Sequence, residues 1–373
     1  MYTSLKIENF KSIKSLDLPL KRVNVLIGEP NTGKSNILEA CALMGTGYAC
    51  DFDSYVKTII RHKHIKELFH RQHFKDRKIE IELGEPSMKD YWAKCTIGYD
   101  NVSRTGSVEI GSKLLVNLSH EADRTEFQFI EFKIEDDSLV FVKNTNGENI
   151  TPFTKISYYN FKYFSLDQIT QPNNINYFML ETPFGRNLMN LVKEEDIQED
   201  QKLLKLIADY FEPYGYKILL NSTENRIQIL RQPNDFSYET IELYMVADTL
   251  LRRIYYDIAI QTHQYDWLER PYLLLLEEPE AYSYPTYVSE LAYEIANDEH
   301  NNQYLLTTHS PHMIYKLIDE LSYEELNIVG VYFEDFQTKV KVFTEDELYE
   351  LLNMGYDLFF SLPSFFSCTT EPA

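Results

Sequence analysis

The stretch from Val23 to Ala40, VNVLIGEPNTGKSNILEA, decides the fold of this chain. It begins with an apolar, β-branched run over 23–27 and ends in a sequence with helical character. Between them, Gly28 to Ser35 spell G-x-x-x-x-G-K-S in the strand–loop–helix context that a phosphate-binding loop requires. A chance glycine turn before a helix is the alternative, and the flanking context argues against it.

The residue types of this loop suit phosphate. Gly28 and Gly33 allow backbone torsions closed to other residues, so successive N–H groups can point at phosphate oxygens. The positive end of the following helix lies at the same point. Lys34 is expected to reach the β- and γ-phosphates, and the Ser35 hydroxyl to bind Mg²⁺. We predict that the whole loop binds nucleotide: Gly28, Glu29, Pro30, Asn31, Thr32, Gly33, Lys34, Ser35 and Asn36.

A second pattern, LLLLEEPE over 273–280, ends a buried apolar run in acids. At the carboxyl end of a parallel strand, such acids project into the ligand crevice. Glu277 is expected to help hold Mg²⁺ through its water shell. Glu278 is expected to orient and deprotonate the attacking water. The alternative is a strand end with a solvated acidic turn, which fits less well in a chain that already has a phosphate loop.

A third pattern, LLTTHSP over 305–311, is another apolar strand that ends in a polar cluster. His309 is expected to contact the γ-phosphate or to position the water, while Thr308 and Ser310 add hydrogen bonds. A lone histidine after a strand is usually structural, but the order of the three patterns favours a functional one. The predicted catalytic residues are therefore Lys34, Glu278 and His309.

Composition limits the remaining function classes. The chain has 373 residues, 44% of them hydrophobic, and a net charge of −22, which argues against indiscriminate coating of nucleic acid. It contains no apolar run long enough to span a bilayer and no signal pattern, so we expect no membrane contact. Its four cysteines lack metal or disulfide spacing, which favours the cytoplasm.

One segment, 57–78, is rich in Lys, Arg and His despite the acidic total. A solvated, mostly helical surface is the ordinary explanation of such a run. A polyanion-binding or partner-binding face is the alternative, and its candidate residues are Arg61, Lys63, Lys66 and Arg71.

The remaining pattern predicts an α/β chain with a mixed or parallel core sheet, an antiparallel β lobe and a helical lobe. Alternating residues over 78–159 predict the antiparallel lobe. We expect strands at 5–8, 16–18, 156–164, 272–276 and 304–308, helices at 186–212, 244–263, 287–297, 313–321 and 345–354, and hairpins at 216–231 and 327–343. The aromatic tail 359–366 is either packed or disordered. We divide the chain into 1–165 (phosphate loop and β insertion), 166–265 (helical lobe) and 266–373 (the rest of the core).

These motifs together carry a resemblance. LKIENFKSI (5–13), GEPNTGKSN (28–36), LLLLEEPEAYSYP (273–285) and LLTTHSPHMI (305–314) resemble the ABC-type P-loop ATPases of the RecF/SMC and OLD-like group. The chain is most similar to the compact AAA-15/AAA-21 ATPases, which include ATPase components of antiphage systems such as Septu and PARIS. The resemblance implies a two-lobed head, ATP and Mg²⁺ as cofactors, and a homo-oligomer in which protomers sandwich nucleotides.

The resemblance also implies roles for single residues. It implies that Ser35 and Glu277 bind Mg²⁺ and that Glu278 activates the attacking water. It also implies that His309 has the role of the family's switch histidine. The family's Ser-Gly signature is absent; the corresponding region is 244–253, where Asp248 and Thr249 cap the predicted helix and Arg252 is a candidate phosphate contact. Gln168 is our choice for the glutamine that helps to bind the metal.

Three functions are compatible with these patterns. The first is an ATPase that regulates a separate effector, a nuclease or toxin, in antiphage defence, because neither a Toprim domain nor long heptad arms are evident. The second is a DNA-repair ATPase of RecF type. The third is a nucleotide-locked scaffold with little turnover, which the altered signature favours.

Overall fold

The structure is a computed structural model and describes most of the chain. The described residues are 1–45, 58–72, 78–84, 92–100, 105–116, 124–135, 138–144, 156–163, 180–182, 185, 187–197, 201–221, 226–234, 237–241, 245–263, 272–353 and 358–366. Over these residues, none of the helices combines the length and apolar character that crossing a bilayer demands.

A six-stranded sheet forms the centre of the molecule, in the order β16-β15-β3-β14-β13-β9. Its strands are β3 (Val23–Ile27), β9 (Ile156–Tyr159), β13 (Leu273–Glu277), β14 (Gln303–Thr307), β15 (Leu326–Glu334) and β16 (Gln337–Val342). Neighbouring strands are parallel except β15 and β16, which form an antiparallel hairpin. The predicted mixed, mostly parallel core sheet is therefore confirmed.

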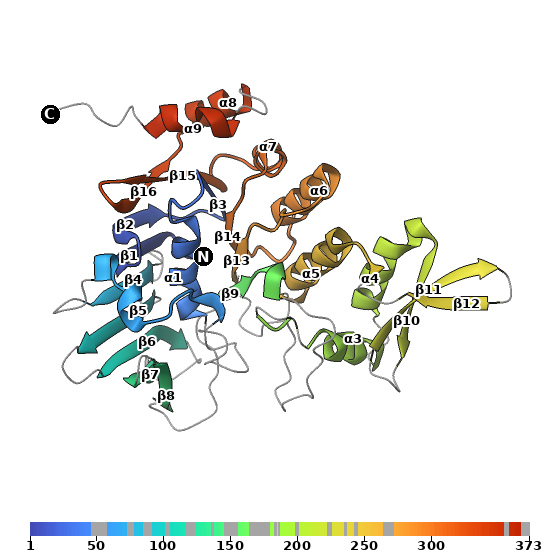
Figure 1. Ribbon diagram of the computed structural model, residues 1–373, viewed down its shortest axis with the longest axis horizontal. Helices are drawn as coiled ribbons and strands as arrows, with labels where there is room; N and C mark the ends of the chain where they lie inside the picture. The colour runs from blue at the N-terminus through green and yellow to red at the C-terminus, as the bar shows by residue number, and fades with distance from the viewer. Residues whose placement is uncertain are drawn as a thin grey trace.

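The two faces of this sheet belong to two separate cores, because successive side chains of a strand point to opposite faces. Leu273 and Leu275 pack with α1 (Lys34–Met44) in one core. Leu274 and Leu276 pack in the other. That second core contains residues of the helices α5 (Asp248–Thr262), α6 (Pro285–Ala296) and α7 (Pro311–Glu320), which Figure 1 shows to the right of the sheet.

An antiparallel sheet lies on the α1 side, in the order β2-β1-β4-β5-β6-β7-β8. Its strands are β1 (Ser4–Phe10), β2 (Ile13–Pro19), β4 (Ile79–Gly84), β5 (Trp92–Asp100), β6 (Thr105–Val116), β7 (Arg124–Glu135) and β8 (Ser138–Asn144). The antiparallel lobe predicted over 78–159 is present. The strands expected at 5–8 and 16–18 are confirmed as β1 and β2, which pair antiparallel, and β1 also pairs with β4.

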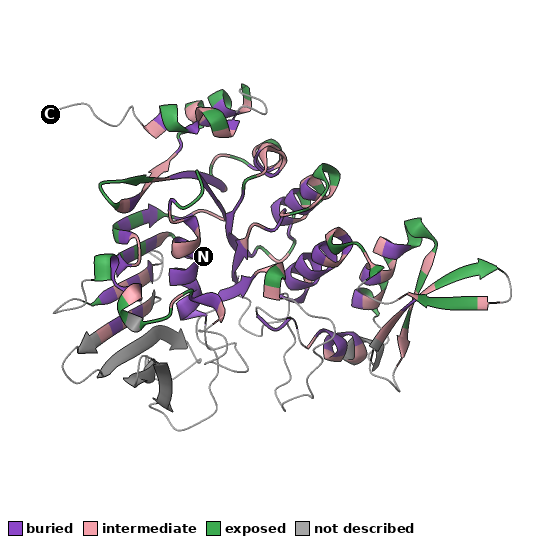
Figure 2. Ribbon diagram, viewed as in Figure 1, coloured by how far each residue is buried: buried purple, intermediate pink, exposed green. Residues whose placement is uncertain are grey.

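The helical lobe contains more elements than expected. The single helical stretch predicted over 186–212 is two helices, α3 (Leu188–Ile197) and α4 (Lys202–Phe211). The predicted hairpin is β10 (Tyr216–Asn221) and β11 (Arg226–Asn234), and β12 (Ser237–Ile241) adds a third strand. Figures 1 and 2 show that β11 and β12 project from the body and that β12 is largely exposed.

Two helices end the described chain, α8 (Glu345–Asn353) and α9 (Leu358–Phe366). The aromatic tail that the sequence left open is therefore a packed helix, with Leu358, Leu362 and Phe365 buried. Its carbonyl at Phe365 accepts a hydrogen bond from Lys341 Nζ at 2.8 Å.

Two element predictions were wrong. The segment 65–72, expected to be helical, consists of two short 3₁₀ turns, η2 (Ile65–Leu68) and η3 (His70–Gln72). Its backbone is held by the β1–β2 turn instead, since Lys11 N donates to Leu68 O at 2.7 Å. The strand predicted over 156–164 ends at Tyr159 and is followed by a 3₁₀ turn, η4 (Phe161–Tyr163).

A buried ion cluster joins the β1–β2 turn to α1 and to the segment after it. Glu39 on α1 is 1% exposed and pairs with Lys11 and, at 2.7 Å, with Arg61 Nε. Removing one partner of a buried pair leaves the other charge uncompensated, which costs about 3–5 kcal/mol. We expect Glu39→Gln to lower the free energy of unfolding by about 3 kcal/mol, the lower end of that range, because Arg61 stays partly solvated.

Chemical denaturation measures this change. Asp17→Asn is the control, because Asp17 pairs with Lys6 at 3.4 Å on the surface and such pairs contribute about 0–1 kcal/mol. Equal effects of the two substitutions would show that the Glu39 cluster contributes no more than a surface pair.

Candidate functional site

The three sequence motifs meet at one edge of the central sheet. The register pairs Leu26 of β3 with Thr307 of β14, and Thr307 with Glu277 of β13. The carboxyl ends of these strands are therefore level, as ligand crevices of parallel sheets require. The backbone N–H of Glu278 donates to Thr307 Oγ1 at 3.1 Å, which joins the second motif to the third.

The phosphate loop depends on its last glycine. Gly33 has φ +103°, and a Cβ there would lie 2.1 Å from Thr338 Oγ1 and 2.8 Å from Ser12 Oγ. The same Thr338 hydroxyl donates to Thr32 O at 2.8 Å, and Asn36 Nδ2 donates to Ser12 Oγ at 2.6 Å. A hydrogen-bonded network from β16 and the β1–β2 turn therefore supports the loop.

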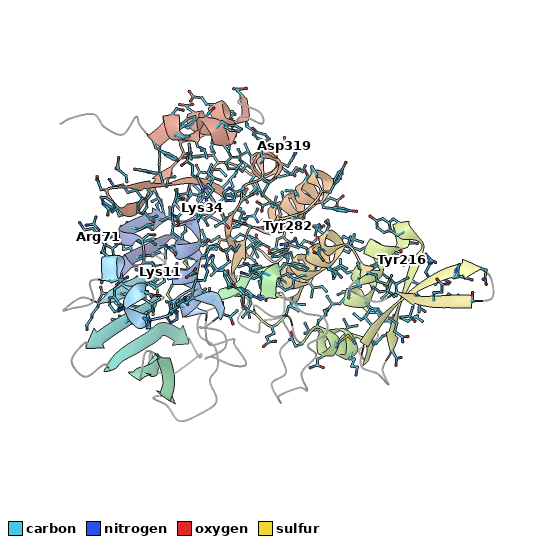
Figure 3. All side chains as sticks on the ribbon, viewed as in Figure 1. Lys11, Lys34, Arg71, Tyr216, Tyr282 and Asp319 are labelled. Carbon is cyan, nitrogen blue, oxygen red and sulfur yellow. The ribbon has the colours of Figure 1, made fainter. Side chains whose placement is uncertain are left out.

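Lys34 is folded back onto its own loop. Its Nζ donates to Gly28 O and to Glu29 O, both at 2.8 Å. Burial lowers the pKa of Lys34 to about 8, against the opposing charges of Glu278 and Glu29. Figure 3 shows Lys34 in the left half of the view, near the strands of the central sheet. The lysine is thus a desolvated cation that an anionic ligand would stabilise.

Glu277 is the most heavily contacted acid of the site. It accepts hydrogen bonds from Tyr158 OH, from Asn160 Nδ2 at 2.8 Å, from Arg61 Nη2 at 3.2 Å and from the Ser35 hydroxyl. Burial works to raise the pKa of Glu277, but these contacts outweigh it and the net direction is downward. Glu277 is therefore ionised, and a carboxylate beside a hydroxyl is a donor set that fits Mg²⁺.

Glu278 and His309 face each other across the same edge. His309 Nε2 lies 3.5 Å from Glu278 Oε1, and Glu278 has the unusual backbone angle φ +43°. Burial lowers the pKa of His309, the charge of Lys34 adds to this, and Glu278 opposes both. The imidazole is therefore neutral at pH 7, with a partly exposed carboxylate beside it.

A third acid holds this arrangement in place. Glu280 is buried, and its Oε1 accepts hydrogen bonds from Thr308 Oγ1 and from His309 N, both at 2.7 Å. Burial raises the pKa of Glu280. Glu280, Ser12 and Thr338 are site residues that no sequence motif assigned a role. The only signal was the third acid of LLLLEEPE.

The signature-like residues make contacts within their own chain. The predicted capping by Asp248 and Thr249 was wrong, because α5 has Ala247 at its N-cap and, within the described residues, no side-chain cap hydrogen bond. Asp248 is the first residue of the helix, and Thr249 Oγ1 donates to Tyr282 O at 3.1 Å instead. Arg252 is buried, with its guanidinium carbon 4.5 Å from the centre of the Phe161 ring. The phosphate contact of Arg252 stays a prediction. Gln168 lies outside the described residues.

Two residues of the candidate basic face, Arg61 and Arg71, make polar contacts although their side chains are exposed. Arg61 is engaged by Glu39 and Glu277, and Arg71 Nη2 donates to Asp335 O at 2.8 Å. Lys63 and Lys66 are exposed. All four candidate residues are exposed, so the face stays a prediction; Arg61 also contacts Glu277 in the site described above.

Comparison with known proteins agrees with this geometry. The family model described as "AAA ATPase domain", AAA_15, matches residues 1–266. No curated protein matches the chain.

Three solved structures are similar to the chain. An SMC head bound to the C-winged helix domain of ScpA matches with a TM-score of 0.52 and 13% identity, covering 94% of this chain and 99% of that one. The SMC head domain from Thermotoga maritima has a TM-score of 0.43 and 12% identity, with 92% and 99% covered. The third structure is an SMC head with an extended coiled coil, bound to the C-terminal domain of ScpA derived from Pyrococcus furiosus. It matches with a TM-score of 0.47 and 13% identity, covering 94% of this chain and 98% of that one.

The first likeness shows that the fold is that of an SMC head, which confirms the fold expected from the resemblance. The family match extends over more than two thirds of the sequence, from the phosphate loop through the helical lobe. This chain belongs to the AAA_15 family of AAA ATPase domains.

Proposed function

We propose that this chain binds and hydrolyses ATP with Mg²⁺. The observation that carries the proposal is the meeting of Lys34, Ser35, Glu277, Glu278 and His309 at one edge of the central sheet, joined by the contacts described above. Phosphoryl transfer to water needs positioning and charge stabilisation more than covalent chemistry, and this group of side chains offers both.

Each residue has a defined task in this proposal. Lys34 exchanges its two loop carbonyls for phosphate oxygens. Ser35 and Glu277 would hold Mg²⁺, which would supply positive charge to offset that of the phosphates. Glu278 accepts a proton from the attacking water, and neutral His309 donates or accepts a hydrogen bond beside it.

Phosphate release by the full chain in MgATP tests the proposal. Steady turnover supports it, provided that the site variants considered below abolish it. Binding of MgATP without turnover would instead favour the nucleotide-locked scaffold. Absence of both binding and turnover would overturn the assignment of the site.

We further propose that the chain self-associates and regulates a separate effector, a nuclease or toxin, in antiphage defence. The support is the resemblance of its motifs to the ATPase components of such systems. Mass measurement with and without ATP–Mg²⁺ tests self-association. Phage challenge of cells that carry the chain with its neighbouring open reading frame, against cells that carry it alone, tests the effector role.

A DNA-repair ATPase of RecF type is the alternative, and the exposed Lys63 and Lys66 favour it. It requires DNA binding that weakens with salt and is reduced by the double charge reversal Lys63→Glu, Lys66→Glu. Each lost phosphate contact lowers the salt slope by about 1. Lys14→Glu is the control, because Lys14 is an exposed lysine on β2. If the double variant and the Lys14→Glu control bind DNA equally in a filter-binding titration, Lys63 and Lys66 do not form a DNA-binding face.

A further inference from the structure

Helix α9 reaches the same edge of the central sheet as the phosphate loop. Gly330 of β15 pairs with Ile27, the last residue of β3 before that loop. A Cβ on Gly330 would lie 2.4 Å from the Phe366 ring, so the glycine leaves room for α9 to pack closely. Stacking of Phe366 on Tyr332, with ring centres 4.7 Å apart, fixes the end of the helix on β15.

The first turn of α9 contacts the candidate catalytic histidine. The ring centres of Phe359 and His309 are 6.1 Å apart, with the planes tilted by 38°. Such ring pairs fall within the range of favourable aromatic contacts. Phe359 is half-buried against the core, whereas the next residue, Phe360, is 87% exposed.

Within the part of the chain that the structure describes, few other groups hold the His309 side chain that this contact orients. The backbone N–H of His309 is fixed by Glu280, and its Nε2 faces Glu278 at 3.5 Å, longer than a good hydrogen bond. The imidazole plane therefore depends on packing. Phe359 supplies an apolar wall on one side.

We propose that Phe359 is a positioning residue for His309, so that helix α9 sets the rate of ATP hydrolysis. The proposal rests on the proposed function. It concerns a segment beyond residues 1–266, the part of the chain that the family model covers.

Phe359→Ala tests the proposal through a split between kcat and KM. Misplacing a reacting group by about 1 Å costs about 100-fold. Because His309 keeps its backbone anchor, we expect a roughly tenfold fall in kcat with KM for ATP within about twofold. Phe359→Leu, which keeps an apolar side chain, is expected to recover most of the rate.

Phe360→Ala is the matched control. It removes the same ring from the neighbouring position of the same helix, where the side chain faces solvent. Its rate is expected to equal that of the unmodified chain. If Phe359→Ala and Phe360→Ala hydrolyse ATP equally fast, the proposal is overturned.

A second readout does not depend on turnover. Among the described residues, the charged groups facing His309 are Glu278 and Glu280 from the loop after β13 and Lys34 from the phosphate loop, while α9 carries no ionisable side chain. Opening the Phe359 side to water removes part of the burial that lowers the pKa of His309. We therefore expect the pKa of His309 to be higher in Phe359→Ala than in the unmodified chain. An NMR titration of the imidazole measures this shift.

The two readouts separate the possible failures. A shifted titration in a chain that does not hydrolyse ATP would refute the proposed function and leave the contact established. An unshifted titration with an unchanged rate would refute the positioning role alone. His309→Gln identifies the imidazole signal.

Discussion

Glu278→Gln is expected to lower the rate of ATP hydrolysis by about 100- to 10,000-fold, the range that a positioned general base contributes. The amide cannot accept the proton of the attacking water, although it fills the same space. Its backbone N–H still donates to Thr307 Oγ1, so the loop geometry is retained. We expect the affinity for ATP to change by less than about threefold, because the proton transfer occurs only in the transition state.

Single-turnover phosphate release and equilibrium binding of a fluorescent ATP analogue measure the two quantities separately. Glu290→Gln is the control, since Glu290 is an exposed glutamate on α6. Hydrolysis at an undiminished rate in Glu278→Gln would remove the general base from the mechanism. The same loss of rate with a parallel loss of binding would show that Glu278 supports the nucleotide rather than the water.

The sequence predicted the central sheet and the meeting of its motifs well. Strands such as β13 are continuous apolar runs because both faces of a parallel sheet are covered, and such runs are easy to recognise. The residues of each motif are also contiguous in the sequence, so the motif can be recognised without knowledge of the fold. Ser35, Glu277, Glu278 and His309 meet because parallel strands bring their carboxyl ends to one edge.

Contacts between distant residues could not be read in the same way. Ser12 and Thr338 are separated by 326 residues, and nothing in either local pattern indicates their 2.6 Å contact beneath the loop. Arg61 stands in a basic run that suggested a surface, and its side chain is exposed, but nothing in that run indicates its ion pairs with Glu39 and Glu277. The local sequence pattern indicates whether a segment is a helix or a strand. Which distant residue a side chain contacts is determined by the tertiary fold.

The departures in secondary structure have similar causes. The segment 65–72 has the polar spacing of a helix, but hydrogen bonds to the β1–β2 turn compete with helix formation. The tail 358–366 contains Pro363 and several aromatic residues, which weaken any helical signal. It is helical because its buried side chains pack on β15 and the central core, consistent with packing as the main source of helix stability.

Lys34→Ala is expected to weaken ATP binding by about 10- to 100-fold, because a hydrogen bond to a charged group contributes about 1.5–3 kcal/mol. We expect hydrolysis to fall further, by at least about 100-fold, since a donor aimed at developing charge acts more strongly in the transition state. Lys14→Ala is the control, as an exposed lysine on β2. If Lys34→Ala binds ATP as tightly as the unmodified chain, the assignment of this loop as the phosphate-binding loop is refuted.

Thermal unfolding separates lost binding from lost folding in this variant. Burial lowers the pKa of Lys34 to about 8, below its unfolded value of 10.5. Below pH 8 the lysine is charged in both the folded and the unfolded state, so its desolvation lowers the free energy of unfolding. This cost disappears as the pH rises from about 8 to 10.5, where only the unfolded state still binds the proton. At pH 7, Lys34→Ala is therefore expected to melt no lower than the unmodified chain. Saturating MgATP is expected to raise the Tm of the unmodified chain and of Lys14→Ala, but not of Lys34→Ala, because only a ligand bound to the folded state stabilises it.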